Sequence, residues 1–352
     1  MRRALICLFL HASLTHAAGA EGVVFPALDG SSGTEMVVYS SLDEPLARPL
    51  VQAFQARHPE VSLRYVDLLT GEIAARVVAE TDRGEPTADL VFSSAMDLTV
   101  KLANDGYASV VRPEGARDWP DWAIWRDTVF ALTFEPAVIV YHKPTFPDGP
   151  PDTRAELMDW LATSGPGLIG TYDISRSAVG YLFLMRDLEH FADLWPMIDA
   201  MGRAGVQTFP TSKDVIDRVR TGEIALGYNI LGSYASDQAG RYPELGLVLP
   251  RDYVVVVSRV AMVPRAARAP ELGEAFLSFL VSREGQEVLA QRLRLPAVSL
   301  EVSGKVGALD MQEALQATLR PVPVSPGLLA YLDPATRARV LARWTAALEG
   351  GE

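Results

Sequence analysis

Two pairs of adjacent serines occupy similar places in the sequence, each after a run of β-prone residues and before a helix-like segment. Ser40 and Ser41 end the first run, and Ser93 and Ser94 follow the second. Hydroxyl groups and the free N–H groups at helix N-termini are groups that bind anions. The pairs therefore predict a small anion-binding site, and simple capping of the following helices is the alternative.

A third polar group lies in the second half of the chain, where Ser175, Arg176 and Ser177 join a predicted strand to a predicted helix. A planar guanidinium between two hydroxyls could make a two-pronged contact with an oxyanion bound at the helix N-terminus. We therefore expect Arg176 to be the main cationic contact of an anionic ligand. The alternative is an arginine on the solvent-exposed surface.

Three further residues are candidate ligand contacts. Tyr228 and Asn229 end another predicted strand, where side chains of parallel sheets often meet a ligand. Arg259 follows Ser258 in a long β-branched segment and could either reach the ligand or pair with a carboxylate. Both alternatives for Arg259 stay open at this point.

The sequence predicts neither a metal site nor covalent chemistry. Beyond the first 20 residues the histidines are His58, His142 and His190, and none has metal-ligand spacing with another. The sequence contains no P-loop signature and no G-x-S-x-G motif. We therefore expect a binding protein rather than an enzyme, with no metal and no other cofactor.

Composition describes a globular chain that has room for two cores. The chain has 352 residues and a formal net charge of -12, which argues against nucleic acid as a partner. Residues 1–20 combine Arg2 and Arg3 with a short apolar run and a small-residue cleavage site, which predicts a secretory signal peptide. The single cysteine, Cys7, lies within this segment, so the processed chain would have no thiol.

The elements that must position these side chains alternate between strand and helix. The expected strands are 36–39, 61–66, 89–92, 168–172, 206–209, 225–229 and 245–249. Two longer β-rich segments, 134–143 and 251–264, are interpreted as crossings between two halves of the molecule. A long amphipathic helix is expected over 271–289 and a final helix over 334–348. This alternation predicts an α/β fold with largely parallel sheets.

Several of these segments together resemble one known family, the periplasmic solute-binding proteins of ABC importers with type II topology. The segments that carry the resemblance are MVVYSSLDEP, ADLVFSSAMDL, VIVYHK, LGYNILGSYA and SRVAMVPRAARAPELGEAFLSFLVSREGQ. The resemblance covers the chain from Met36 to about Ala290. The branch that it is most similar to contains binders of ferric iron and of phosphorylated organic compounds.

The resemblance implies a monomer of two α/β lobes, each a mostly parallel sheet flanked by helices, with the ligand in the cleft between them. The implied boundaries are 35–133 and 258–352 for lobe one, 137–254 for lobe two, and a hinge near 134–136 and 255–257. It also implies a periplasmic location, hinge closure around the ligand and delivery to a membrane permease.

The sequence departs from the iron-binding pattern of that branch, in which adjacent tyrosines of lobe two hold the metal. Here Tyr228 is followed by Asn229, and the next tyrosine is Tyr234. The expected ligand is therefore a small anion, an organophosphate or a carboxylate. Two alternatives are kept: a ferric-iron carrier of the same fold, and an accessory protein that presents its ligand to a membrane sensor kinase.

Overall fold

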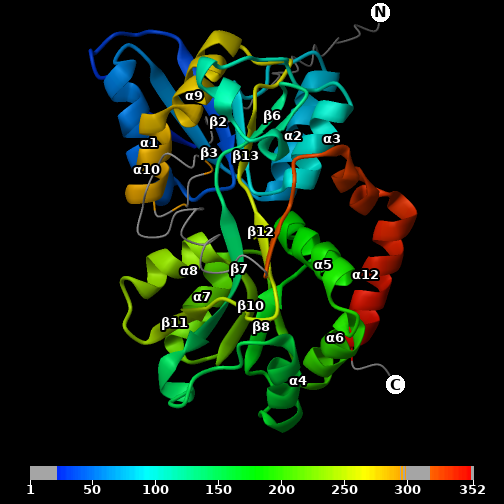
Figure 1. The fold of residues 1–352 in the computed structure, drawn as a ribbon. Helices are drawn as coiled ribbons and strands as arrows, with labels where there is room; N and C mark the ends of the chain where they lie inside the picture. Colours follow the sequence, from blue (N-terminus) through cyan, green and yellow to red (C-terminus); the bar gives the residue numbers. More distant parts are fainter. Residues whose placement is uncertain (1–21, 294, 296–297, 299–317, 350–352) are drawn as a thin grey trace, which may run out of the picture.

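The computed structural model describes residues 22–293, 295, 298 and 318–349, so the predicted signal peptide lies outside the described residues. Two α/β lobes, each built on its own seven-stranded sheet, lie one above the other in Figure 1. Within the described residues, no helix combines the length and apolarity that crossing a membrane requires.

Lobe one, the upper lobe in Figure 1, is built on the sheet β1-β3-β2-β4-β13-β6-β5. Its strands are β1 Val23–Phe25, β2 Glu35–Ser40, β3 Ser62–Asp67, β4 Leu90–Ser93, β5 Ile124–Trp125, β6 Val129–Ala131 and β13 Val260–Met262. Its helices are α1 Glu44–Arg57, α2 Thr70–Asp82, α3 Met96–Asn104, η1 Glu114–Asp118, η2 Asp121–Ala123, α9 Pro270–Val281 and α10 Arg283–Gln291.

Lobe two is built on the sheet β14-β12-β7-β10-β8-β9, in which β11 also pairs with β7. Its strands are β7 Glu135–His142, β8 Ile169–Tyr172, β9 Gln207–Phe209, β10 Leu226–Leu231, β11 Leu245–Val248, β12 Val254–Val257 and β14 Leu319–Pro321. Its helices are η3 Lys143–Thr145, α4 Arg154–Thr163, α5 Ala178–His190, α6 Leu194–Arg203, α7 Ser212–Thr221 and α8 Gly232–Ala239. A terminal segment follows with η4 Pro326–Leu332 and α12 Pro334–Leu348.

The predicted two-lobe α/β fold is confirmed, but the sheets are mixed rather than mostly parallel. Parallel pairing holds for β3-β2-β4 in lobe one and for β10-β8-β9 in lobe two. The strands at the crossings add antiparallel pairs to these sets: β7 pairs with β10, β12 pairs with β7, and β13 pairs with β4. Their antiparallel pairing follows from the chain leaving one lobe and returning to it.

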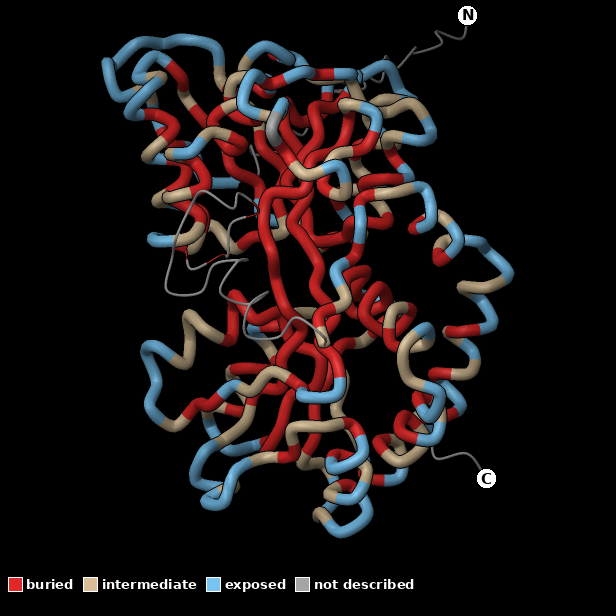
Figure 2. The backbone as a smooth tube through the Cα atoms, in the orientation of Figure 1, coloured by how far each residue is buried: buried red, intermediate tan, exposed pale blue. Residues whose placement is uncertain are grey.

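The two crossing strands β7 and β12 lie side by side between the lobes, where Figure 2 shows them as buried backbone. Pro136 pairs with Val256 and Glu135 pairs with Val257 in an antiparallel ladder. This pair lies where the sequence predicts the hinge. Bending of the molecule at this pair stays a prediction.

The terminal segment differs from the prediction that all of 258–352 belongs to lobe one. Strand β14 joins the sheet of lobe two beside β12, and η4 then packs against α3 of lobe one. Helix α12 returns to lobe two and packs against α6, where Arg343 pairs with Asp199. The helical pattern of this segment was readable from the sequence, but the lobe on which it packs depends on contacts between distant residues.

The helix predicted over 271–289 is two helices, α9 and α10, which separate at Ser282. The Ser282 hydroxyl caps α10 by accepting a hydrogen bond from the Gly285 N–H at 3.2 Å. A Cβ atom at Gly285 would come within 2.0 Å of the Phe279 carbonyl oxygen, so this turn requires glycine. Gln286 is fully buried and donates to backbone carbonyls of lobe one, which fixes α10 against the sheet.

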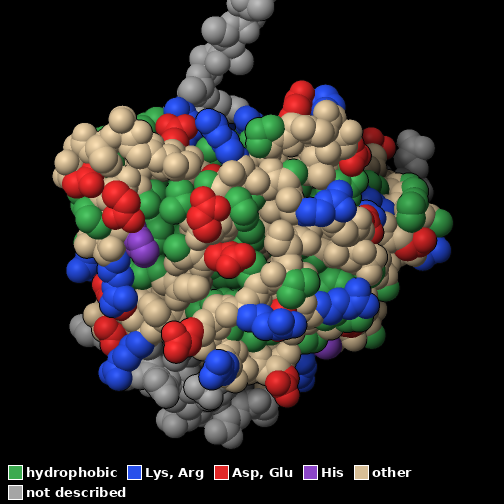
Figure 3. All heavy atoms as spheres, turned by 90° about the horizontal axis from the view of Figure 1, so that it is seen from above, with side chains coloured by type: hydrophobic (Ala, Val, Ile, Leu, Met, Phe, Trp, Pro, Cys, Tyr) green, Lys and Arg blue, Asp and Glu red, His purple; other side chains and the backbone are tan. Residues whose placement is uncertain are grey.

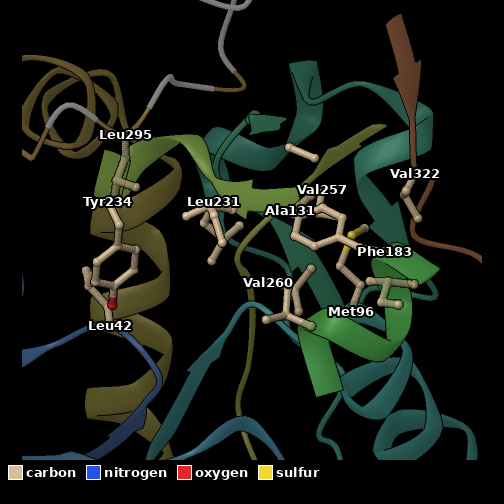
Figure 4. Packing of buried hydrophobic residues seen from close by; sticks show 14 of the residues in the cluster. Leu42, Met96, Ala131, Phe183, Leu231, Tyr234, Val257, Val260, Leu295 and Val322 are labelled. Carbon is tan, nitrogen blue, oxygen red and sulfur yellow. The ribbon is translucent and has the colours of Figure 1, made fainter. Parts of the chain in front are cut away.

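Apolar side chains of the two lobes pack together beside the crossing strands (Figure 4). Leu42 of lobe one lies against the ring of Tyr234 of lobe two, and Met96 of α3 lies near Phe183 of α5. Burial of apolar surface is the main force that holds such contacts together. The structure therefore describes a molecule whose lobes are in contact.

Charged side chains of both signs are interspersed on the face of lobe one that Figure 3 shows. The chain as a whole is acidic, with a net charge of -12. If the ligand is the anion that the sequence predicts, its attraction must come from groups close to it, because salt screens charges beyond about 8 Å at physiological ionic strength.

Replacing Gly202 by alanine tests the packing of α12 on lobe two. A Cβ atom at this position would lie 1.9 Å from the Ala347 carbonyl oxygen, so α12 must move. We expect Gly202→Ala to lower the free energy of unfolding by about 1–3 kcal/mol, as overpacking does. It should also speed amide hydrogen exchange in α12. Gly165→Ala, where the new Cβ meets only an ordinary contact, is the control, and equal exchange in both variants would refute this packing.

Candidate ligand-binding site between the lobes

A cavity of about 230 Å³ lies between the two lobes. Its lining comes from Ser41, Asp43, Asp67, Leu68, Leu69, Thr70, Glu72 and Ser94 of lobe one and from Tyr172, Arg176, Ser177, Val179, Pro210, Thr211, Ser212, Lys213, Leu231 and Tyr234 of lobe two. One water occupies about 30 Å³ in the liquid. The cavity therefore suits a compact solute.

Only one serine of each predicted pair lines this cavity. Ser41 and Ser94 face it, and the Ser41 hydroxyl accepts a hydrogen bond from the Ser94 N–H at 3.1 Å. Ser40 and Ser93 are buried, and each accepts a backbone N–H two residues ahead. Ser40 and Ser93 are the last residues of β2 and β4, and neither lines the cavity. Ser40 and Ser93 therefore stabilise the turns that follow their strands. Neither caps the next helix as the alternative expected, because the N-caps of α1 and α3 are Asp43 and Ala95.

The predicted arginine group opens α5 of lobe two. Ser177 is the N-cap of this helix and accepts the Gly180 N–H at 3.3 Å. Arg176 is exposed and lines the cavity, and within the described residues its side chain has no ion pair. Ser175 instead donates to Asp173 at 2.6 Å and does not line this cavity. Arg176 and Ser177 therefore keep their predicted places, and Ser175 does not.

A second helix N-terminus at the cavity was missed in the sequence. Thr211 caps α7 by accepting the Asp214 N–H at 3.2 Å, and Ser212 and Lys213 follow in its first turn. The Ser212 hydroxyl also lies 2.5 Å from the Tyr172 hydroxyl. Thr211 directly after the strand at 206–209 is a start signal of the same kind as Ser177, and it could have pointed to this second site.

Tyr228 and Asn229 do not line the interlobe cavity. The Tyr228 hydroxyl accepts from Arg154 at 2.8 Å and donates to Asp187 at 2.8 Å. Asn229, held at a φ of 58°, donates to the same Asp187 at 2.6 Å. Arg154 and Asp187 are both buried and form an ion pair at 3.1 Å. These two predicted ligand contacts are therefore parts of an internal network of lobe two.

Arg259 combines both alternatives that the sequence left open. It is fully buried, and its Nε lies 3.2 Å from Oε1 of the buried Glu135. Its Nη1 donates to the Ser41 hydroxyl at 3.3 Å, directly behind the cavity wall. Glu135 also accepts from Thr133 at 2.8 Å and from Ser233 of α8. Arg259 therefore links the cavity wall to the crossing strand β7.

Direct hydrogen bonds close the cavity between the lobes. The Tyr234 hydroxyl donates to Asp43 Oδ1 at 2.8 Å and accepts the Asp43 N–H at 3.2 Å. Thr70 of lobe one accepts the N–H of Ala178, the first residue of α5, at 3.3 Å. Burial raises the pKa of the Tyr234 phenol well above its usual value, so the phenol keeps its proton and can donate it to Asp43.

Lobe one brings carboxylates to the cavity that the sequence did not single out. Asp67 keeps solvent contact and accepts the Glu44 N–H at 3.3 Å. Desolvation, followed by repulsion from Asp43, raises the pKa of the Asp67 carboxyl to about 6. In the described part of the chain, no group of three or more His, Cys, Asp or Glu side chains is placed to hold a metal ion.

Comparison with known proteins places these features in one family. The family model described as bacterial extracellular solute-binding protein matches residues 35–292, which is most of the chain. The chain belongs to this family. Its members bind solutes and are not enzymes, so the predicted family and the absence of an enzymatic role are both confirmed. A comparison with curated proteins returned no match.

Solved structures with the same fold include one with high sequence identity. The substrate-binding protein of an ABC transporter from Agrobacterium tumefaciens is 55% identical, with a TM-score of 0.90 over 93% of this chain and 98% of that chain. AfuA from Actinobacillus pleuropneumoniae, with fructose-6-phosphate bound, is 16% identical, with a TM-score of 0.75 over 91% of this chain and 99% of that one. Iron-bound HitA from Pseudomonas aeruginosa is 17% identical, with a TM-score of 0.69 over 88% of this chain and 98% of that one.

Replacing Tyr228 by phenylalanine distinguishes a structural role from a ligand contact. The change removes a hydroxyl that joins Arg154 to Asp187 in a buried site. We expect Tyr228→Phe to lower the free energy of unfolding of ligand-free protein by about 1–3 kcal/mol in urea denaturation. Tyr242→Phe, at a tyrosine that is 36% exposed, should change it little. Unchanged stability of Tyr228→Phe would return Tyr228 to the list of candidate ligand contacts.

Proposed function

We propose that this chain captures a small anionic solute, of the organophosphate or carboxylate class, in the interlobe cavity and delivers it to the permease of an ABC importer. The observation that carries the proposal is the convergence of two helix N-termini, those of α5 and α7, on one cavity beside Arg176. The solute-binding family supports a periplasmic location and a membrane permease as the partner.

The groups on the lobe-two side can stabilise an anion despite the acidic surface. A helix N-terminus stabilises a nearby anion by about 0.3–1 kcal/mol, and by up to about 2 kcal/mol in partly buried sites. A charge-assisted hydrogen bond contributes about 1.5–3 kcal/mol. Ser177 and Thr211 cap the two helices, and Arg176 has no competing ion pair within the described residues. Both interactions act over hydrogen-bond distances, at which salt screening is weak.

The fold alone does not choose between a phosphorylated ligand and iron. AfuA holds fructose-6-phosphate and HitA holds iron on similar folds. In this chain the phenols at the cavity are Tyr172 and Tyr234. Burial raises the pKa of Tyr172 to about 12 and raises the pKa of Tyr234 well above its usual value. Two protonated phenols are poor ligands for ferric iron, which supports an anionic ligand rather than iron. The partner could also be a sensor kinase, and the contacts described here do not favour it over a permease.

Variants of Arg176 test the anion site. We expect Arg176→Ala to weaken the binding of propyl phosphate, or of butyrate for a carboxylate site, by about 10- to 100-fold. Arg176→Lys should restore part of the affinity, because lysine keeps the charge but loses the planar fork. The measurement is calorimetric titration of each anion into wild type and variants.

The matched control is Arg203→Ala, at an exposed arginine of lobe two that does not line the cavity. It should bind both anions as wild type does. Equal affinities in wild type, Arg176→Ala and Arg176→Lys would remove Arg176 from the site. A visible tyrosinate-to-iron band on adding ferric citrate to wild type would replace the anion proposal by the iron alternative.

A further inference from the structure

The lobe-one side of the cavity carries an excess of negative charge among the described residues. Asp43 and Asp67 both line the cavity, and within the described chain neither forms an ion pair with a lysine or arginine. Desolvation, together with repulsion from Asp43, raises the pKa of the Asp67 carboxyl to about 6. Asp43 uses Oδ1 to accept the Tyr234 hydroxyl, a neutral donor.

Arg259, a cation behind this wall, interacts with more carboxylates than it can neutralise. Its Nε faces the buried Glu135 at 3.2 Å, so its charge is already opposed by one carboxylate. Its Nη1 reaches the Ser41 hydroxyl at the cavity, and its Nη2 is buried with no hydrogen-bond partner in the described structure. The guanidinium also lies over the ring of Tyr234, with 5.6 Å between Cζ and the ring centroid. Asp43 and Asp67 together therefore keep an excess of negative charge.

The lobe-two side of the same cavity has the opposite polarity. The N-termini of α5 and α7 point partial positive charge at it, and Arg176 and Lys213 line it. Lys213 pairs with Asp217 at 2.7 Å, whereas Arg176 has no ion pair in the described residues. Groups of opposite charge therefore line the two sides of the same cavity, whose volume is about 230 Å³.

We propose that the natural ligand is a compact zwitterion, whose protonated amine lies between Asp43 and Asp67 while its anionic group lies at the N-termini of α5 and α7. This inference rests on the proposed function and adds the second pole of the ligand. An ammonium group supplies up to three donors and one positive charge, which two acceptor-only carboxylates require. A hydroxyl at the same place supplies one donor and leaves both charges uncompensated.

The test compares ligands that share an anion and differ only at the other end. Aminoethyl phosphate, hydroxyethyl phosphate and propyl phosphate form one series, and β-alanine and butyrate form the carboxylate pair. The measurement is calorimetric titration of each compound into wild type. In at least one series, we expect the amine to bind at least tenfold more tightly than the apolar compound of the same size. Asp67→Asn should reduce that ratio at least threefold, because the amine loses an opposite charge whereas propyl phosphate and butyrate lose only a repulsion.

Asp121→Asn, at an exposed aspartate of lobe one that does not line the cavity, is the matched control and should keep the wild-type ratio. Melting temperatures of both variants establish that they are folded. Equal affinity for the amine, the hydroxyl and the apolar compounds, with binding still dependent on Arg176, would overturn the zwitterion and leave the anion site standing. If no compound of either series binds wild type, the anion site and the zwitterion both fall.

Discussion

The buried ion pair between Arg259 and Glu135 is the interaction on which the junction of the lobes depends. Both side chains are fully buried at a separation of 3.2 Å, so removing either would leave an uncompensated charge at a cost of about 3–5 kcal/mol. Glu135 begins β7 and Arg259 lies between β12 and β13, so the pair joins the two crossing strands. Because Arg259 also holds Ser41, the cavity wall keeps a fixed position relative to the predicted hinge.

The position of this pair supports the proposal that this acidic protein binds an anion. One cation near the hinge neutralises Glu135, and the remaining charges at the cavity are separated by lobe. Carboxylates lie on the lobe-one side, and helix N-termini with Arg176 lie on the lobe-two side. The two sides meet only when the lobes are in contact, as in the hydrogen bonds of Tyr234 with Asp43 and of Thr70 with α5. If the lobes close around the ligand as the hinge prediction requires, closure also completes the proposed site.

The sequence predicted what local patterns encode. Strand-to-helix junctions led to Ser41, Ser94 and Arg176, and the final helix was predicted with the bounds that it has in the structure. Contacts between residues that are far apart in the sequence could not be predicted from local patterns. Tyr228 was taken for a ligand contact because it ends a strand, but it is held by Asp187, 41 residues away in the sequence. Asp43 and Asp67 were missed, and the packing of α12 on lobe two was missed for the same reason.

Closure of the lobes around a ligand is the central claim, and small-angle X-ray scattering tests it most directly. The measurement compares protein freed of bound solute with protein saturated by whichever phosphate ester or carboxylate binds it most tightly. A hinge at β7 and β12 predicts a smaller radius of gyration in the saturated protein, with a scattering curve that matches the contacting lobes described here. Identical radii of gyration in the two samples would contradict closure.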